Sequence, residues 1–145
     1  MINKRTVRIN RNVVVTFQQE GIHCFPEAGS RPDLADVSFL QYPHRHIFHF
    51  RVKASVTHND RDIEFIQLKR LCMSYFEDKV IDINRHSCED LCDMLFEKLH
   101  KQYPERDFTI SCFEDGENGA EISYKVNDHL VTEELADFVA ERVEE

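Results

Sequence analysis

Two histidines, His44 and His46, stand two positions apart in the segment HRHIFHFRVKASVT. The alternation of this segment is typical of a β-strand, so both imidazoles would project from one face, about 7 Å apart along the chain. A third histidine, His23, ends the preceding strand-like segment and would meet the pair if the two strands are antiparallel neighbours. Three neutral imidazoles and one open position form the catalytic type of zinc site. The pattern therefore predicts one Zn²⁺ ion on these three residues.

The histidine motif also has an interpretation without a metal. Paired histidines on a strand are common as surface residues or as residues with ordinary hydrogen-bond partners, and the motif alone leaves this alternative open. His49 has the opposite parity to His44 and His46, so it is expected to face away from any bound ion.

Cysteine usage indicates a reducing environment. The chain has five cysteines, an odd number without a CxxC pair, at Cys24, Cys72, Cys88, Cys92 and Cys112. Reduced thiols in a cytoplasmic protein are the expectation. The N-terminal segment MINKRTVRIN has no apolar stretch after its charges, so it does not resemble a secretory signal. No run approaches the ~20 apolar residues of a membrane helix.

Length and charge limit the class of protein further. The chain has 145 residues, 41% of them hydrophobic, and only four glycines and four prolines, which predicts a single folded domain over residues 1–145. The net charge is −9, from 27 acidic and 18 basic residues. A negative surface disfavours non-specific contact with nucleic acid or anionic membranes, so neither is expected as a partner.

The first half of the chain must position the histidines. Residues 6–17 are rich in β-branched side chains and predict a strand that continues towards His23. Residues 26–43 contain three prolines and predict a long loop, which in a compact domain is usually functional. Residues 44–57 form the second predicted strand.

The second half predicts two helices and then two strands. Apolar spacing indicates helices over residues 64–76 and 88–103, the latter with Ser87 as N-cap and Pro104 as terminator. Strands follow over residues 107–113 and 121–126, joined by a turn-rich segment. Thr132 caps a last, acidic helix. The predicted fold class is α+β: an antiparallel sheet in the order β-β-α-α-β-β, two helices on one face, and an added C-terminal helix.

Several segments together resemble the 6-pyruvoyl-tetrahydropterin synthase and 6-carboxytetrahydropterin synthase family. The resemblance includes a histidine-x-histidine strand, an acidic-Phe-x-x-Leu-Lys helix start, and a late strand that ends in a glutamate. In chain order these segments are 17–23, 44–48, 62–69, 87–91 and 110–114. Each motif is loose, and their common order over residues 17–124 carries the resemblance.

Membership of this family would imply a tunnelling fold and a lyase-like reaction. The implied substrate resembles 7,8-dihydroneopterin triphosphate, in pterin or queuosine (7-deazaguanine) precursor metabolism. Zinc would sit on the three histidines, and Glu114 would accept two hydrogen bonds from the amino-imine edge of the ring. The family also implies a cytoplasmic homo-oligomer, a trimer or hexamer, with sites at subunit interfaces.

The chain differs from the family at the positions of the residues that would transfer protons. The family's catalytic cysteine or glutamate should precede His44, but residues 36–43 (DVSFLQYP) contain neither. The family's Leu-Asp-His is also missing, and Asp82 with His86 is the nearest substitute. His86 is therefore the first candidate for the base and Cys88, in the first turn of a helix, the second. Arg45 replaces a glycine, but its parity points it away from the metal.

Two alternatives to the full family activity follow from these departures. One is a catalytically altered relative that keeps zinc and the ring pocket but runs a different reaction on a pterin or deazaguanine, or only binds it. The other is a non-enzymatic module that binds a purine-like ligand or a protein partner.

Overall fold

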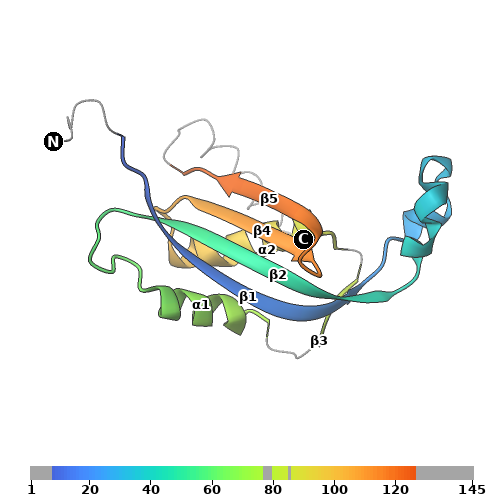
Figure 1. Ribbon diagram of the computed structural model, residues 1–145, viewed down its shortest axis with the longest axis horizontal. Helices are drawn as coiled ribbons and strands as arrows, with labels where there is room; N and C mark the ends of the chain where they lie inside the picture. The colour runs from blue at the N-terminus through green and yellow to red at the C-terminus, as the bar shows by residue number, and fades with distance from the viewer. Residues whose placement is uncertain (1–7, 77–79, 85, 127–145) are drawn as a thin grey trace.

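The computed structural model describes residues 8–76, 80–84 and 86–126, with backbone only for 80–84. These residues form an α+β fold around one five-stranded sheet in the order β3-β1-β2-β4-β5 (Figure 1). The strands are β1 (Arg11–His23), β2 (His44–Val56), β3 (Val80–Asn84), β4 (Phe108–Glu114) and β5 (Asn118–Tyr124). The α-helices are α1 (Phe65–Ser74) and α2 (Cys88–Gln102). The C-terminal helix predicted from Thr132 lies outside the described residues.

The predicted antiparallel core of the sheet is present. β1 pairs with β2, β2 with β4 and β4 with β5, each antiparallel. The prediction missed β3, which joins the edge beside β1 in parallel orientation. Its sequence, VIDIN, is rich in β-branched residues, which favour strands. The segment is short and lies between two predicted helices, so the sequence pattern indicates a connection.

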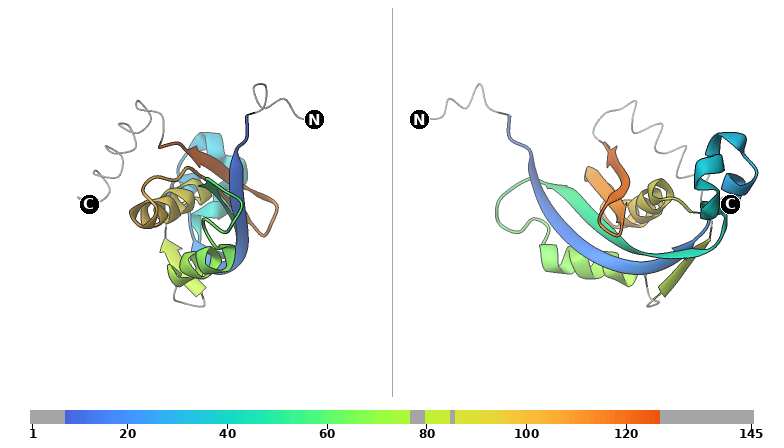
Figure 2. Two further views of the ribbon diagram at one scale, coloured as in Figure 1. Left: turned by 90° about the vertical axis from the view of Figure 1, so that its left-hand side faces the viewer. Right: turned by 45° about the vertical axis from the view of Figure 1, so that its right-hand side comes forward.

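Both α-helices cover one face of the sheet (Figure 2). Alternate residues of β1 and β2 point to that face, and Phe17 stacks on Phe50 across the hairpin with ring centroids 4.9 Å apart. Helix α2 contributes Phe96, which stacks on Tyr124 of β5 at 4.0 Å. The large buried side chains of this layer also include Phe48, Leu68, Leu91, Leu95, Leu99, Phe108 and Ile110. This core fixes the sheet curvature and the position of the start of α2.

The connection between β1 and β2 is more regular than the predicted loop. It contains two 3₁₀ helices, η2 (Pro26–Gly29) and η3 (Pro32–Gln41), each with a proline at its start. The fixed φ of proline suits the first position of a helix, which explains both starts. The connection returns on itself, because the Phe25 amide donates to the Leu40 carbonyl at 2.7 Å.

Helix α2 begins as the sequence predicts. The Ser87 side chain accepts from the Asp90 amide at 3.1 Å, and the Asp90 carboxylate accepts from the Ser87 amide at 3.3 Å. This reciprocal capping box fixes the turn that leads into Cys88. Within the part of the chain that the structure describes, no helix is long and apolar enough to cross a membrane.

Candidate metal centre

The three predicted histidines meet at the end of the β1–β2 hairpin that the connection between the two strands closes. His23 is the last residue of β1 and pairs with His44, the first residue of β2, while His46 pairs with Gly21. One ring nitrogen of each lies within 4.8 Å of the others, so the group could hold a metal ion. The ring of buried Phe48 packs edge-on against His23, with centroids 5.3 Å apart, and closes the site on its core side. The grouping predicted from strand parity is therefore confirmed.

All three imidazoles use Nδ1 to contact an oxygen of the chain. The partners are the His86 carbonyl for His23 at 3.0 Å, the Tyr42 carbonyl for His44 at 2.8 Å, and the Asp115 carboxylate for His46 at 2.6 Å. A carbonyl or carboxylate oxygen can only accept, so in each neutral ring Nδ1 carries the proton and Nε2 carries a lone pair. Such outer partners are the usual way in which proteins orient histidine ligands. The donor set thus fits a metal bound through three Nε2 atoms.

Asp115 is a site residue that the sequence reasoning missed. Besides His46, its carboxylate accepts the amide of Ile47 at 2.9 Å, and it adopts a positive φ of 53° in the turn after β4. These hydrogen bonds, first that from Ile47 and then that from His46, hold the pKa of Asp115 below its usual range. The residue therefore stays ionised and orients the His46 ring. Its position directly after the predicted Glu114 was the available signal.

Glu114 lies against the histidines. At the end of β4, its Oε1 is 3.2 Å from Nε2 of His23, and its Oε2 is 3.4 Å from Nε2 of His46. Its side chain is one-third exposed, whereas that of His23 is 9% exposed. The sequence resemblance implies a ring-binding role for this carboxylate, which stays a prediction, and the structure places it in contact with two histidines of the candidate metal centre.

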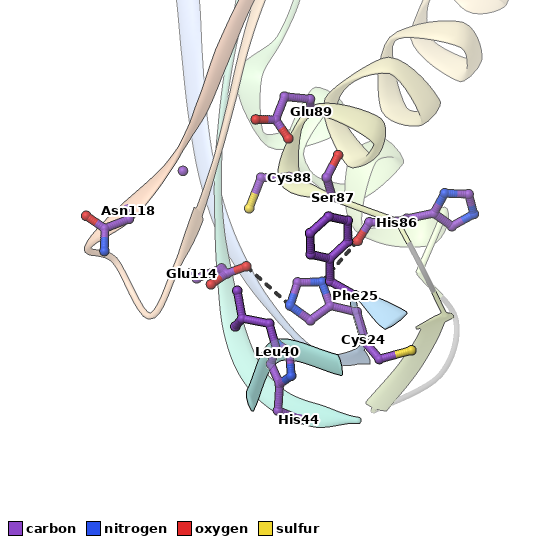
Figure 3. Close-up of a pocket in the computed structure, with 12 residues that line it drawn as sticks. Cys24, Phe25, Leu40, His44, His86, Ser87, Cys88, Glu89, Glu114 and Asn118 are labelled. Carbon is purple, nitrogen blue, oxygen red and sulfur yellow. Dashed lines mark hydrogen bonds and ion pairs between the residues drawn. The ribbon is translucent and has the colours of Figure 1, made fainter. Parts of the chain in front are cut away.

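A cavity of about 340 Å³ opens beside the centre (Figure 3). His23, His44 and Glu114 line one part of it, and Phe25 and Leu40 from the β1–β2 connection add apolar wall. The volume falls within the range of ~300–1,000 Å³ typical of small-molecule sites. Polar groups that converge in a partly apolar hollow are the usual arrangement for binding and orienting a small ligand.

The candidate proton-transfer residues are placed differently from one another. The imidazole of His86 is exposed and extends away from Glu114 (Figure 3), with Nδ1 3.5 Å from Asp90. Asp82 pairs with Ile22 across β3 and β1, but its side chain lies outside what the structure describes, so the Asp82–His86 pair stays a prediction. His86 therefore faces the cavity with its backbone carbonyl, which binds His23.

Cys24 and Cys88 both line the cavity, and Cys88 is the one that the sequence proposed for proton transfer. Its side chain is buried, and its sulfur points to the side of the cavity where Glu114 lies (Figure 3). A hydrogen bond with the Cys112 thiol lowers the pKa of Cys88 and raises that of Cys112, while burial and Glu114 act against the lowering at Cys88. The geometry thus brings the side chain of Cys88, the second candidate from the sequence, closer to Glu114 than the ring of His86.

Two other expectations concern residues outside the centre. Arg45 forms an ion pair with Glu20 at 3.4 Å and is exposed, so it does not crowd the histidines between which it stands. His49 has the opposite parity to His46 and is not part of the metal-binding group found among the described residues.

Sequence comparisons do not supply a family for this chain. No protein-family model matches it, and no curated protein matches it. Its function must therefore be argued from the site.

Proposed function

We propose that this chain is a zinc-dependent, lyase-like enzyme of pterin or 7-deazaguanine precursor metabolism, related to the 6-pyruvoyl- and 6-carboxytetrahydropterin synthases. Strand order supports the proposal, because β1, β2, β4 and β5 are sequential antiparallel neighbours with both α-helices on one face. The tunnelling fold implied by the sequence resemblance has this arrangement. The ordered motifs over residues 17–124 support it independently of the strand pairing.

One observation carries the proposal: three imidazoles and a carboxylate converge beside a ligand-sized cavity. Each imidazole of His23, His44 and His46 has its Nδ1 fixed by an oxygen, which leaves Nε2 for a metal. Three such ligands are typical of catalytic zinc. A zinc ion bound there would act as a Lewis acid towards oxygens of a ligand side chain.

The chain's own residues would hold the organic ligand. The Glu114 carboxylate can accept two hydrogen bonds, as the amino-imine edge of a pterin or guanine requires. Phe25 and Leu40 supply apolar surface that excludes water from part of the cavity. Together these groups would fix the ring while its substituent points towards the histidines.

We propose Cys88 as the group that moves protons. A general base must come within hydrogen-bond reach of the proton that it removes, and Cys88 lines the cavity while the ring of His86 extends away from it. A thiol with a lowered pKa provides more thiolate near neutral pH. This would move the thiol of the family from the segment before His44 to the start of α2.

A ligand-binding or catalytically altered relative is the second candidate function. In the family, the catalytic base is expected in the segment before His44, which here forms the 3₁₀ helix η3. Leu40 is the residue of η3 that lines the cavity among the described residues, and its aliphatic side chain cannot act as a base, which favours the second candidate. The missing base position removes a contribution of typically ~10²–10⁴-fold in rate. We therefore expect turnover well below that of ordinary family members.

The experiment that tests the function uses purified, zinc-loaded protein and 7,8-dihydroneopterin triphosphate. Mass spectrometry follows the products, and calorimetry measures binding of a pterin. We expect binding, slow formation of a 6-substituted tetrahydropterin, and pterin affinity reduced by about 1–3 kcal/mol in Glu114→Gln. Glu89→Gln, at a second cavity carboxylate, is the matched control. Binding without turnover would select the second candidate function, and failure to bind any pterin or guanine-like ring would refute both.

We also propose a homo-oligomer, a trimer or hexamer, located in the cytoplasm. Val14, Ile22 and Ile47 are exposed on the sheet face opposite the helices. β3 and β5 are the end strands of the sheet in the described part of the chain, and end strands can pair with another chain. Light scattering at micromolar concentration should give a multiple of the chain mass, and a monomeric mass would contradict the proposal.

A further inference from the structure

The Glu114 carboxylate lies beside the three histidines, within reach of a metal ion that they could hold. In a tetrahedral zinc site with bonds of ~2.0–2.1 Å, two ligand atoms are separated by about 3.3 Å. The Oε1 atom of Glu114 is 3.2 Å from Nε2 of His23, and Oε2 is 3.4 Å from Nε2 of His46. Each separation is close to the edge of such a tetrahedron, with one oxygen next to His23 and the other next to His46, so a small rotation of the side chain would bring one oxygen to a metal on the histidines.

A direct hydrogen bond does not explain these contacts. Nδ1 of His23 and of His46 each faces an oxygen that must receive a proton, so the neutral rings have no proton left on Nε2. Moreover, Nε2 of His23 is buried and has no hydrogen-bond partner, although Oε1 of Glu114 is near it. In neutral rings, lone pairs therefore face a carboxylate, an arrangement that costs free energy unless a cation or an added proton lies between them.

We infer that Glu114 is the fourth ligand of the metal in the ligand-free protein and that the organic ligand releases it. The inference rests on the metal centre proposed above, and its first part does not depend on the identity of the organic ligand. Four protein ligands close a zinc site, whereas three leave a position for chemistry. Binding of the ring edge by Glu114 would free that position, so one carboxylate would couple ring recognition to opening of the metal.

The surroundings of Glu114 allow this exchange of partners. Its side chain is one-third exposed and lines the cavity, so it has space on the ligand side. The backbone beyond it is held by Asp115, whose carboxylate is bonded to Ile47 and His46. The exchange therefore needs rotation of one side chain and no movement of the turn.

Cobalt substitution tests the inference in the full chain. Co²⁺ reports its ligands through visible absorption bands, and azide binds where a coordination position is open. We expect Glu114→Gln to change the Co²⁺ spectrum and to bind azide at least tenfold more tightly than the wild-type protein. Co²⁺ affinity should fall by at least the ~10-fold that follows loss of even an outer partner of a metal site. Glu89→Gln, which removes another carboxylate of the cavity, should behave as wild type.

The outcomes separate this inference from the proposed function. Identical spectra and azide affinities in wild type and Glu114→Gln would overturn the fourth ligand and leave the three-histidine centre in place. Equal Co²⁺ binding by wild type and His44→Ala would refute the metal centre itself. If Glu114→Gln does not fold, Glu114→Ala replaces it. The wild-type titration also decides alone, because tight azide binding there would show an open position and overturn the inference.

Discussion

Carboxylates at the two ends of the β1–β2 hairpin have opposite surroundings. At one end, Asp62 accepts two parallel bonds from Arg106, one of them at 3.0 Å, and a further bond from the Thr57 amide at 2.8 Å. At the other end, Glu114 faces Nε2 atoms of His23 and His46, which in the neutral rings have no proton to donate. The Asp62 carboxylate is fully paired within the chain, whereas the Glu114 carboxylate needs a cation or a proton that the neutral histidines do not supply.

This difference distinguishes a structural site from a binding site. A bidentate arginine–carboxylate pair satisfies both partners and joins the turn after β2 to the segment before β4. Converging acceptors cannot satisfy one another, and their burial is tolerated only with a cation or a proton. Loss of a partner should therefore affect folding at the Asp62 end and ligand binding at the Glu114 end.

The largest expected effect is the loss of metal from histidine variants. His44→Ala and His46→Ala each remove one of three imidazole ligands, so zinc affinity should fall by more than the ~10–100-fold typical of an outer partner. Metal analysis after dialysis should find little zinc in either variant, while His49→Ala, the matched control on the other face, should retain it. Equal zinc content in all three variants would contradict a metal site at the Glu114 end of the hairpin.

The next effect concerns turnover rather than metal content. If Cys88 is the base, Cys88→Ala should lower turnover by ~10²–10⁴-fold with zinc content unchanged. His86→Ala should have little effect, because its backbone carbonyl, which binds His23, is retained. The opposite result, with activity dependent on His86, would restore the base that the sequence first suggested.

A smaller effect is expected from the outer partner of His46. Asp115→Ala should weaken zinc binding by about 10–100-fold, since the ring loses its acceptor. Asp115→Asn should lose less, because asparagine also accepts a hydrogen bond and tolerates a positive φ. A competition titration with a chelator measures both, with Glu117→Gln as control. Similar affinities for all variants would mean that the turn does not orient the ligand.

The smallest effect is a pH dependence of stability at the Asp62 end. Hydrogen bonds from Arg106, then from the Thr57 amide, lower the folded-state pKa of Asp62, so its contribution is present above the unfolded-state value of ~3.9 and is lost below it. The stability difference between wild type and Asp62→Asn should therefore be larger at pH 7 than at pH 3 in urea unfolding. Asp60→Asn, in the same turn, is the control. A difference that does not change with pH would show that the pair contributes nothing through ionisation.

The grouping of the three histidines could be predicted from the sequence because strand geometry specifies it. The two-residue period brings His44 and His46 to one face, and hairpin pairing brings His23 to them. The ends of α2 could be predicted as well, since Ser87 and Pro104 are strong local signals.

Other features depended on information that no single segment contains. The contact of Glu114 with His46 requires the β2–β4 register, in which Phe48 pairs with Glu114, and nothing local specifies that register. The orientation of His86 and Cys88 depends on the turn at the start of α2, where a single residue, Ser87, separates an exposed ring from a buried thiol. Parallel strand β3 depends on pairing with the edge of β1.

The connection between β1 and β2 has a thermodynamic consequence. His23 and His44 bracket a chain excursion of about 20 residues, so a metal held by both acts as a removable cross-link that closes this ring of polypeptide. Because the histidines come together only in the folded chain, the free energy of metal binding would become free energy of folding. A bound metal would thus raise the free energy of local unfolding at this end of the hairpin. The same would hold for the connection that carries Phe25 and Leu40, which form part of the cavity wall.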